Sequence, residues 1–296
     1  MSSVLGIVGS ARPWGNSEVL VRQALRGAEF EGAATSLLRL PTLHLEPCTG
    51  CMRCVIGGRP CPLDDDMRWL IDTIQAADGL VLAAPTYFLG PAAVVKLVLD
   101  RLLMVTGQLD QDLPPPRPAI TVATAGLESW RGMTLPYLNA LVGAFGYQPI
   151  DSVTAIAPGP GEILLDTALM ERLQAAGLHL AQGQLSRTPA AANICPTCHS
   201  DAFAIYGDRM VCPICGRSAS LHVHDGGIEL SFETDTGSKQ RWTPEGLREH
   251  MVDWVVATGP RYLSLRQEIK DRRRPLRQMA AEWLCPPSSA GRTGRR

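Results

Sequence analysis

Four cysteines lie close together in the segment 48–61, with the spacing C-x2-C-x2-C-x6-C. Short C-x2-C steps let successive thiolates converge on one polynuclear centre, and a run that ends in Cys-Pro, as Cys61-Pro62 does here, is typical of iron–sulfur ligation. The candidate ligands are Cys48, Cys51, Cys54 and Cys61. The spacing favours an iron–sulfur cluster, while a tetrahedral zinc site and a loop without metal stay open as alternatives.

A second group of four cysteines follows near the C-terminus. Cys195-Pro-Thr-Cys198 and Cys212-Pro-Ile-Cys215 form two C-P-x-C knuckles separated by thirteen residues. Two such knuckles are a strong signal for a tetrahedral four-thiolate site. We predict zinc or a rubredoxin-like iron, two metals that these ligands do not distinguish well. Short hairpin-like runs surround the knuckles, and this small ribbon needs its metal to hold together.

A third candidate site is the turn of residues 9–17, which connects a strand-like segment to a helical pattern. Main-chain N–H groups and the positive end of a helix dipole make such a turn an anion site. Ser10, Asn16 and Ser17 can add donors, and Arg12 can add a bidentate charge. The turn, which also contains Gly15, is neither G-x4-G-K-[ST] nor G-x-G-x-x-G. An ordinary turn with a Ser/Asn cap is the alternative.

Buried strand patterns alternate with helical patterns over residues 1–186 and must position these sites. The expected strands are Val4–Val8, Ala34–Leu40, Gly79–Ala84, Ala119–Thr124 and Ser152–Ala157. This alternation predicts an α/β fold with a parallel sheet covered by helices on both faces. Ligands of open α/β sheets bind beyond the carboxyl ends of the strands, where the chain places Pro85–Gly90 and Thr124–Gly126.

The chain divides into three expected parts. Residues 1–186 form the α/β domain, 187–232 the four-cysteine ribbon, and 233–296 helices with a disordered tail. Ser186–Ala192 is the expected linker, Ser288–Arg296 the expected tail, and Pro275 should kink or end a helix over 261–284. We interpret Asp64–Asp66 as negative charge at a helix N-terminus.

Composition restricts the function. The chain has 296 residues, is 45% hydrophobic and carries a net charge of −1, so it can bury a core and has no global attraction for nucleic acid. No signal peptide is visible, and no apolar run reaches the roughly 18–20 residues of a membrane span. Nine cysteines without an export signal favour a reducing cytoplasm and metal binding over disulfides.

The order of these motifs resembles the NADPH-dependent FMN reductase group and, within it, the iron–sulfur flavoproteins. The resemblance covers roughly residues 1–180. It is carried by the turn of residues 9–17, the cysteine loop followed by Asp64–Met67, then Pro85–Phe88, then Lys96 with Asp100-Arg101. It implies a flavodoxin-like fold, a doubly wound sheet of strand order 2-1-3-4-5, with FMN at the carboxyl ends of the strands.

The resemblance also implies roles for individual residues. Ser10, Arg12, Asn16 and Ser17 would hold the FMN phosphate, with Gly15 in the same turn. Pro85, Thr86, Tyr87, Phe88 and Gly90 would lie along the isoalloxazine, together with Thr124, Ala125 and Gly126. The cysteines of segment 48–61 would hold a 4Fe–4S cluster. Relatives are commonly homodimers or homotetramers in which the cluster passes electrons to flavin across a subunit interface.

These observations predict an FMN- and cluster-dependent oxidoreductase that passes electrons from NAD(P)H or a ferredoxin to an unidentified acceptor. One alternative is a cluster-free NAD(P)H-dependent FMN or quinone reductase. Another is a zinc-ribbon adaptor or nucleic-acid-binding protein on a flavodoxin scaffold. The near-zero charge and the lack of interleaved aromatic residues argue against nucleic acid. The last cysteine gap is long for the family, and residues from 187 onward extend beyond a minimal flavoprotein.

Overall fold

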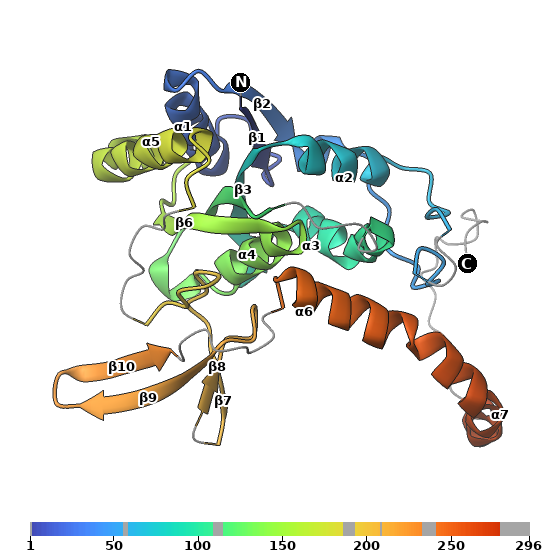
Figure 1. Ribbon diagram of the computed structural model, residues 1–296. Helices are drawn as coiled ribbons and strands as arrows, with labels where there is room; N and C mark the ends of the chain where they lie inside the picture. The colour runs from blue at the N-terminus through green and yellow to red at the C-terminus, as the bar shows by residue number, and fades with distance from the viewer. Residues whose placement is uncertain are drawn as a thin grey trace.

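The computed structural model describes residues 2–55, 59–108, 115–185, 193–207, 209–232 and 241–278. It contains a layered α/β body, a small β-ribbon and a helical C-terminal arm (Figure 1). The expected linker Ser186–Ala192 and the expected tail Ser288–Arg296 lie outside the described residues.

The body is built on a parallel sheet with the order β2-β1-β3-β5-β6. Its strands are β1 (Ser3–Val8), β2 (Ala34–Arg39), β3 (Gly79–Tyr87), β5 (Arg117–Ala125) and β6 (Tyr147–Ile156). Each neighbouring pair is parallel. The flavodoxin-like fold and its predicted strand order are therefore confirmed. The numbering differs because the short strand β4 (Gly90–Pro91) pairs antiparallel with the end of β3.

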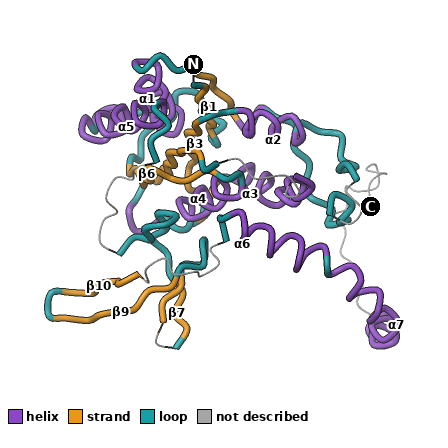
Figure 2. The backbone as a smooth tube through the Cα atoms, viewed as in Figure 1, coloured by secondary structure: helices purple, strands orange, loops and turns teal. Residues whose placement is uncertain are grey.

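Helices cover both faces of the sheet, as the purple segments of Figure 2 show. One face carries α1 (Asn16–Phe30) and α5 (Thr167–Ala181), and the other carries α2 (Met67–Ala76), α3 (Ala93–Asp100) and α4 (Thr134–Ala144). Alternation along the strands supplies a core to each side: in β1, Val4 and Val8 pack under α1, while Leu5 and Ile7 pack under α2.

Helices α1 and α5 pack unusually close together. A Cβ atom added at Gly27 would lie 2.0 Å from the Gln174 carbonyl oxygen, and one at Gly177 would lie 1.9 Å from that of Ala24. Only glycine allows two backbones to approach this closely. The contact fixes α1, whose N-terminus follows the turn of residues 9–17.

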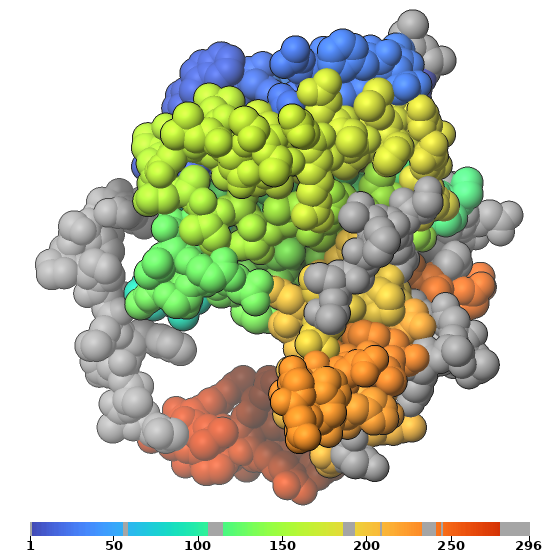
Figure 3. Space-filling model, turned by 90° about the vertical axis from the view of Figure 1, so that its left-hand side faces the viewer, coloured from blue at the N-terminus to red at the C-terminus, as the bar shows by residue number. Residues whose placement is uncertain are grey.

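The ribbon is an antiparallel sheet of order β10-β9-β8-β7. Its strands are β7 (Ala204–Tyr206), β8 (Arg209–Val211), β9 (Ser218–His224) and β10 (Gly227–Phe232). The space-filling view shows the ribbon, in orange, directly below the body (Figure 3). The predicted hairpin-like runs are therefore present, and the last run contains two strands rather than one.

The C-terminal arm consists of α6 (Pro244–Arg248), a π-helical segment (Glu249–Val256) and α7 (Thr258–Arg277). Pro275 lies within α7, which ends two residues later, close to where proline was expected to end it. Among the described residues, no helix is both long enough and apolar enough to cross a lipid bilayer.

Candidate functional site

The turn of residues 9–17 lies where β1 ends and α1 begins, at the carboxyl edge of the sheet. Ser10 is buried and its hydroxyl accepts a hydrogen bond of 3.2 Å from the Arg12 N–H. The Arg12 side chain is exposed, and it forms no ion pair with any residue that the structure describes. A helix N-terminus with an uncommitted guanidinium beside it fits the phosphate of a flavin nucleotide.

Arg39, at the end of β2, braces this turn from behind. Its Nη1 donates to the carbonyl oxygens of Ser10 at 2.7 Å and Arg12 at 3.2 Å, and its Nη2 donates to Glu18 at 2.5 Å. No local sequence motif marks Arg39. The available signal was its position, because Arg39 pairs in register with Val8, immediately before the turn.

Glu18 is the buried counterpart of Arg39. It also accepts hydrogen bonds from the Trp14 N–H at 2.7 Å and from Arg22 at 2.9 Å. Burial opposes its ionisation, but the hydrogen bonds from Trp14, Arg39 and Arg22 outweigh burial and hold the pKa of Glu18 below its ordinary value. The carboxylate therefore stays charged and keeps the turn in place.

Two predicted phosphate ligands have side chains with other partners. The Asn16 amide donates to the carbonyl oxygens of Ala157 at 3.0 Å and Gly159 at 2.9 Å. The Ser17 hydroxyl lies 3.0 Å from that of Thr124. These side chains hold the end of β5 and the segment after β6 against the turn. Of the predicted donors, Arg12 alone has an exposed side chain without a hydrogen-bond partner among the described residues, whereas Ser10 is buried.

The end of β3 forms a tight hairpin with β4. Thr86 pairs with Pro91 and Tyr87 with Gly90, so the loop contains only Phe88 and Leu89. Both have positive φ, 49° and 68°, as a type I′ turn requires. Such turns favour Asn-Gly, and non-glycine residues held there are strained in a way that is common at functional sites. The Phe88 side chain is 91% exposed.

The loop after β5, residues 127–133, braces this hairpin. The Thr86 and Thr134 hydroxyls lie 2.7 Å apart, and the Met133 N–H donates to the Leu89 carbonyl at 2.8 Å. A Cβ atom at Gly132 would lie 2.2 Å from that same oxygen, so the close approach requires glycine. The two predicted isoalloxazine segments, Pro85–Gly90 and Thr124–Gly126, thus belong to one connected wall.

Large apolar side chains are exposed along this edge of the sheet, which we call the aromatic rim. Its members are Trp14, Tyr87, Phe88, Leu89, Leu127 and Trp130. They come from the turn of residues 9–17, the β3–β4 hairpin and the loop after β5, the segments that follow three neighbouring strands. Exposed apolar side chains gathered in this way are typical of ligand-binding surfaces.

The four cysteines of segment 48–61 line one pocket with Arg101 and Met104. The Gly50 N–H donates to the Cys48 sulfur at 3.4 Å. Positive φ angles at Gly50 (65°) and Met52 (58°) curl the loop around the pocket. Main-chain N–H groups directed at sulfur and an inward-curled loop suit a cluster with several thiolate ligands.

The electrostatics of this pocket also fit a metal centre. Burial raises the pKa of the Cys54 thiol, and the other three cysteine sulfurs raise it further by repulsion. The Arg53 main-chain N–H lowers the pKa of Cys51. Several neighbouring thiolates repel one another unless a cation joins them, and metal binding removes their protons. The residues present therefore fit an iron–sulfur cluster.

Asp65 has a second role beside the expected one. We interpreted Asp64–Asp66 as helix N-terminal charge, and Asp65 accepts a hydrogen bond of 3.2 Å from the N–H of Met67, the first residue of α2. Asp65 also forms a buried ion pair with Arg101 and accepts a hydrogen bond of 2.8 Å from the Glu46 N–H. This carboxylate anchors the approach to the cysteine loop, a role that depends on a residue 36 positions away.

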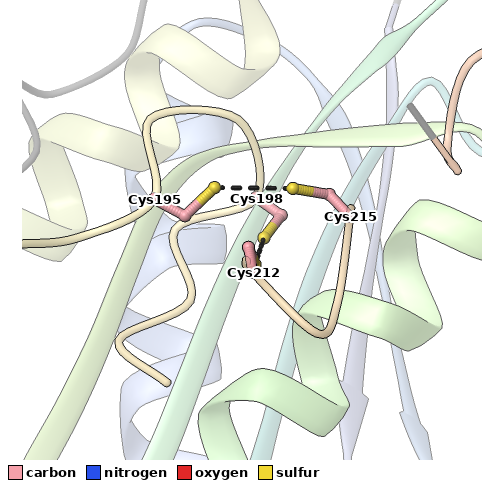
Figure 4. A group of neighbouring side chains, drawn as sticks. All are labelled: Cys195, Cys198, Cys212 and Cys215. Atoms are coloured by element: carbon pink, nitrogen blue, oxygen red, sulfur yellow. Dashed lines mark hydrogen bonds between the residues drawn. The ribbon is translucent and has the colours of Figure 1, made fainter. Parts of the chain in front are cut away.

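The second cysteine group converges fully. The sulfurs of Cys195, Cys198, Cys212 and Cys215 all lie within 4.8 Å of one another, and all four residues are buried (Figure 4). Each knuckle is closed by main-chain hydrogen bonds, such as Cys195 N–H to the Ser200 carbonyl at 2.8 Å. This compact arrangement fits a single tetrahedral metal ion, as the spacing predicted.

Trp242 connects this module to the body. Its ring packs on α4 so closely that a Cβ atom at Gly143 would lie 2.9 Å from it. The preceding residue, Arg241, donates its N–H to the Cys215 carbonyl at 3.1 Å. The second knuckle is therefore linked to α4 through two adjacent residues.

Comparison with known proteins identifies the family. Residues 2–158 match the model of the NADPH-dependent FMN reductase family. Over 98 residues the chain is 42% identical to an iron–sulfur flavoprotein of Methanocaldococcus jannaschii, a match that spans 33% of this chain and half of that protein. It is 28% identical to a flavone synthase of Aspergillus candidus, across 97% of this chain and 99% of that one.

A solved structure of a flavone reductase superposes with a TM-score of 0.75 and 21% identity, covering 96% of this chain and all of that one. This likeness supports the fold, including the C-terminal part. The family model covers more than half of the chain and includes the turn of residues 9–17, the cysteine loop and the aromatic rim. The chain belongs to the NADPH-dependent FMN reductase family and is an oxidoreductase, with FMN as the cofactor that this membership supports.

Proposed function

We propose that this protein is an FMN-dependent oxidoreductase with a 4Fe–4S cluster in the segment 48–61, and that NAD(P)H or a ferredoxin supplies its electrons. The observation that carries the proposal is the single pocket lined by Cys48, Cys51, Cys54 and Cys61. When bound, FMN exchanges two electrons and the cluster exchanges one. The residues of this chain bind and orient these groups.

The FMN site that we propose extends along the carboxyl edge. Arg12 and the N-terminus of α1 would bind the phosphate, with Arg39 and Glu18 fixing the turn. The β3–β4 hairpin would lie along the isoalloxazine, held in place by the loop after β5. Binding of an extended anionic and aromatic ligand needs a charged end and an apolar wall, and these segments supply both.

Cofactor analysis of anaerobically purified protein tests this proposal. We expect FMN together with about four irons and four acid-labile sulfides per chain, the content of one cubane cluster. Broad absorption near roughly 400 nm should accompany the flavin bands. FMN and zinc without sulfide would favour the cluster-free FMN or quinone reductase. Zinc without any flavin would favour the adaptor.

A flavone-like molecule is the acceptor that we favour. The observation behind it is the match over nearly the full length of both chains to a flavone synthase. That name makes a flavone the product, and we propose the reverse direction for this chain, in which a flavone is reduced. The aromatic rim offers exposed rings such as Phe88 and Trp130 for stacking on a planar phenolic compound. NAD(P)H would give a hydride and the solvent a proton, so that both add across one carbon–carbon double bond and NAD(P)⁺ is released.

Incubation with apigenin tests this acceptor. Under anaerobic conditions with excess NADPH or NADH, we expect the 2,3-dihydro product by mass spectrometry, in an amount equal to the nicotinamide oxidised. Menadione serves as the comparison acceptor. Reduction of menadione without any dihydro product would contradict the flavone assignment and leave the oxidoreductase assignment intact.

The C-terminal module and the environment of the protein complete the proposal. We propose that Cys195, Cys198, Cys212 and Cys215 bind zinc, or a single iron, because their sulfurs fit one tetrahedral ion. Both cysteine groups need free thiolates, so we propose a reducing compartment, the cytoplasm. We also propose a homodimer or homotetramer, which sedimentation of the holoprotein would test.

A further inference from the structure

Arg101 occupies an unusual position beside the cysteine pocket. It lies just after α3, is only 2% exposed, and directs its guanidinium to several partners. Its Nη1 donates to the Asp65 carboxylate and, at 3.2 Å, to the Glu46 carbonyl oxygen. Its Nη2 donates to the Cys61 sulfur at 3.5 Å and lies 3.6 Å from the Met104 sulfur. One side chain thus joins a carboxylate and a candidate cluster ligand.

We propose that Arg101 is a positioning residue for the iron–sulfur cluster: it holds Cys61 at the pocket and raises the cluster's reduction potential through its N–H donor. This inference rests on the proposed function, because it needs a cluster at Cys48–Cys61. Hydrogen bonds to the sulfurs of a cluster are among the factors that set its potential. A donor stabilises the reduced state, which carries one more negative charge.

Asp65 determines how Arg101 acts. Its carboxylate is itself fixed by the N–H groups of Glu46 at 2.8 Å and Met67 at 3.2 Å, so the orientation of the guanidinium follows from the main chain. The Asp65 charge offsets much of the Arg101 charge. The effect on Cys61 therefore arises chiefly from the directed N–H group rather than from net positive charge, which makes it sensitive to geometry.

An arginine is needed for this arrangement. Its planar fork directs donors to opposite sides at once, whereas a lysine ammonium is a compact point charge on a flexible chain. In Arg101→Lys the buried charge of Asp65 keeps a partner, and the donor to Cys61 is lost. The substitution therefore separates the hydrogen bond to sulfur from the ion pair.

Arg117 provides a matched control. It is partly buried, whereas Arg101 is fully buried, and it donates to the carbonyl oxygens of Gln75 at 2.6 Å and Ala77 at 2.7 Å. It begins β5, so it lies at the opposite edge of the sheet from the candidate FMN site. Arg117→Lys makes the same chemical change without touching the cysteine pocket.

The test compares wild-type, Arg101→Lys and Arg117→Lys holoproteins, purified anaerobically. EPR-monitored redox titration gives the cluster potential, and absorbance gives the FMN potential in the same samples. We expect a more negative cluster potential in Arg101→Lys only, with the FMN potential unchanged. A tenfold decrease in the equilibrium constant for one-electron reduction of the cluster corresponds to a shift of about 59 mV in its potential.

Iron and sulfide per chain give the second measurement. Loss of the cluster from Arg101→Lys, with a full complement in Arg117→Lys, supports the positioning role. Equal loss from both variants, or a loaded Arg101→Lys with the wild-type potential, overturns it. Wild-type protein with FMN but without acid-labile sulfide overturns the proposed cluster itself. A loaded wild type with an unshifted Arg101→Lys overturns only the role of Arg101.

Discussion

The Asp201 carboxylate lies 2.5 Å from the Arg131 guanidinium, and this ion pair joins the four-cysteine module to the loop after β5. Asp201 follows the first knuckle closely, and the Arg131 carbonyl oxygen accepts a hydrogen bond of 3.3 Å from Thr86, at the base of the β3–β4 hairpin. The C-terminal module therefore contacts the wall of the candidate FMN site. This contact consists of one partly exposed ion pair.

We expect Asp201→Asn to have a small and specific effect. The Arg131 side chain is 42% exposed, so the ion pair stabilises the contact by about 0.2–1 kcal/mol. The KM for the acceptor should rise by up to about fivefold, the change that 1 kcal/mol produces. FMN affinity should not change. Steady-state kinetics measures this KM. Asp225→Asn is the control, because Asp225 is exposed. Equal KM changes in both variants would argue against a link between the Asp201–Arg131 ion pair and the acceptor site.

Cys198→Ser tests the independence of the two metal sites. Loss of one of four buried thiolates should release the metal, because the cysteines themselves form the buried cluster of the described ribbon residues. We expect faster proteolysis within residues 193–232 and unchanged FMN content. Metal analysis and limited proteolysis give the result. Simultaneous loss of FMN would contradict the division into separate domains.

Arg12→Ala should weaken FMN binding. A hydrogen bond to a charged group contributes about 1.5–3 kcal/mol, so the Kd for FMN should rise by about ten- to a hundredfold. Quenching of flavin fluorescence on titration into apoprotein measures this Kd. Arg26→Ala is the control, because Arg26 lies on the following helix α1, over the Phe30 ring. An unchanged Kd in Arg12→Ala would refute the assignment of the phosphate site.

Glu18 makes stability depend on pH in a defined direction. Because its pKa is lower in the folded than in the unfolded protein, its ion pair with Arg39 stabilises the fold fully above the unfolded pKa. This stabilisation is lost as the pH falls through the lowered folded pKa. Denaturant unfolding of wild type and Glu18→Gln should differ most at neutral pH and converge in acid. A difference that grows with acidification would have the wrong sign.

Relieving the backbone strain of the β3–β4 hairpin should stabilise the fold and weaken acceptor binding. Replacing Phe88-Leu89 with Asn-Gly relieves two strained positions, each worth about 1–3 kcal/mol, and should raise the Tm. The Met133 hydrogen bond uses the main chain and should persist. Acceptor binding should weaken because the exposed Phe88 ring is lost. A higher Tm with unchanged KM would show that the rim does not bind the acceptor.

The sequence predicted those features that arise from local patterns. Alternating strand and helix patterns predicted the parallel sheet, the family resemblance implied its strand order, and C-x2-C spacing identified both cysteine groups. The β3–β4 turn was missed because Phe88-Leu89 lacks the Asn-Gly signal of its turn type. Arg39 and the Asp65–Arg101 pair were missed because their partners are distant in sequence, and only the folded chain brings them together.

The anchors of Asp65 lie outside the cysteine loop itself. Its carboxylate contacts the loop segment before the cysteines at Glu46, the start of α2 at Met67, and Arg101 just after α3. Because both ends of the loop are fixed independently of what lies between them, residues can be inserted or deleted within it at small entropic cost. Evolution could thus vary the last cysteine gap, and with it the shape of the metal pocket, without moving either helix.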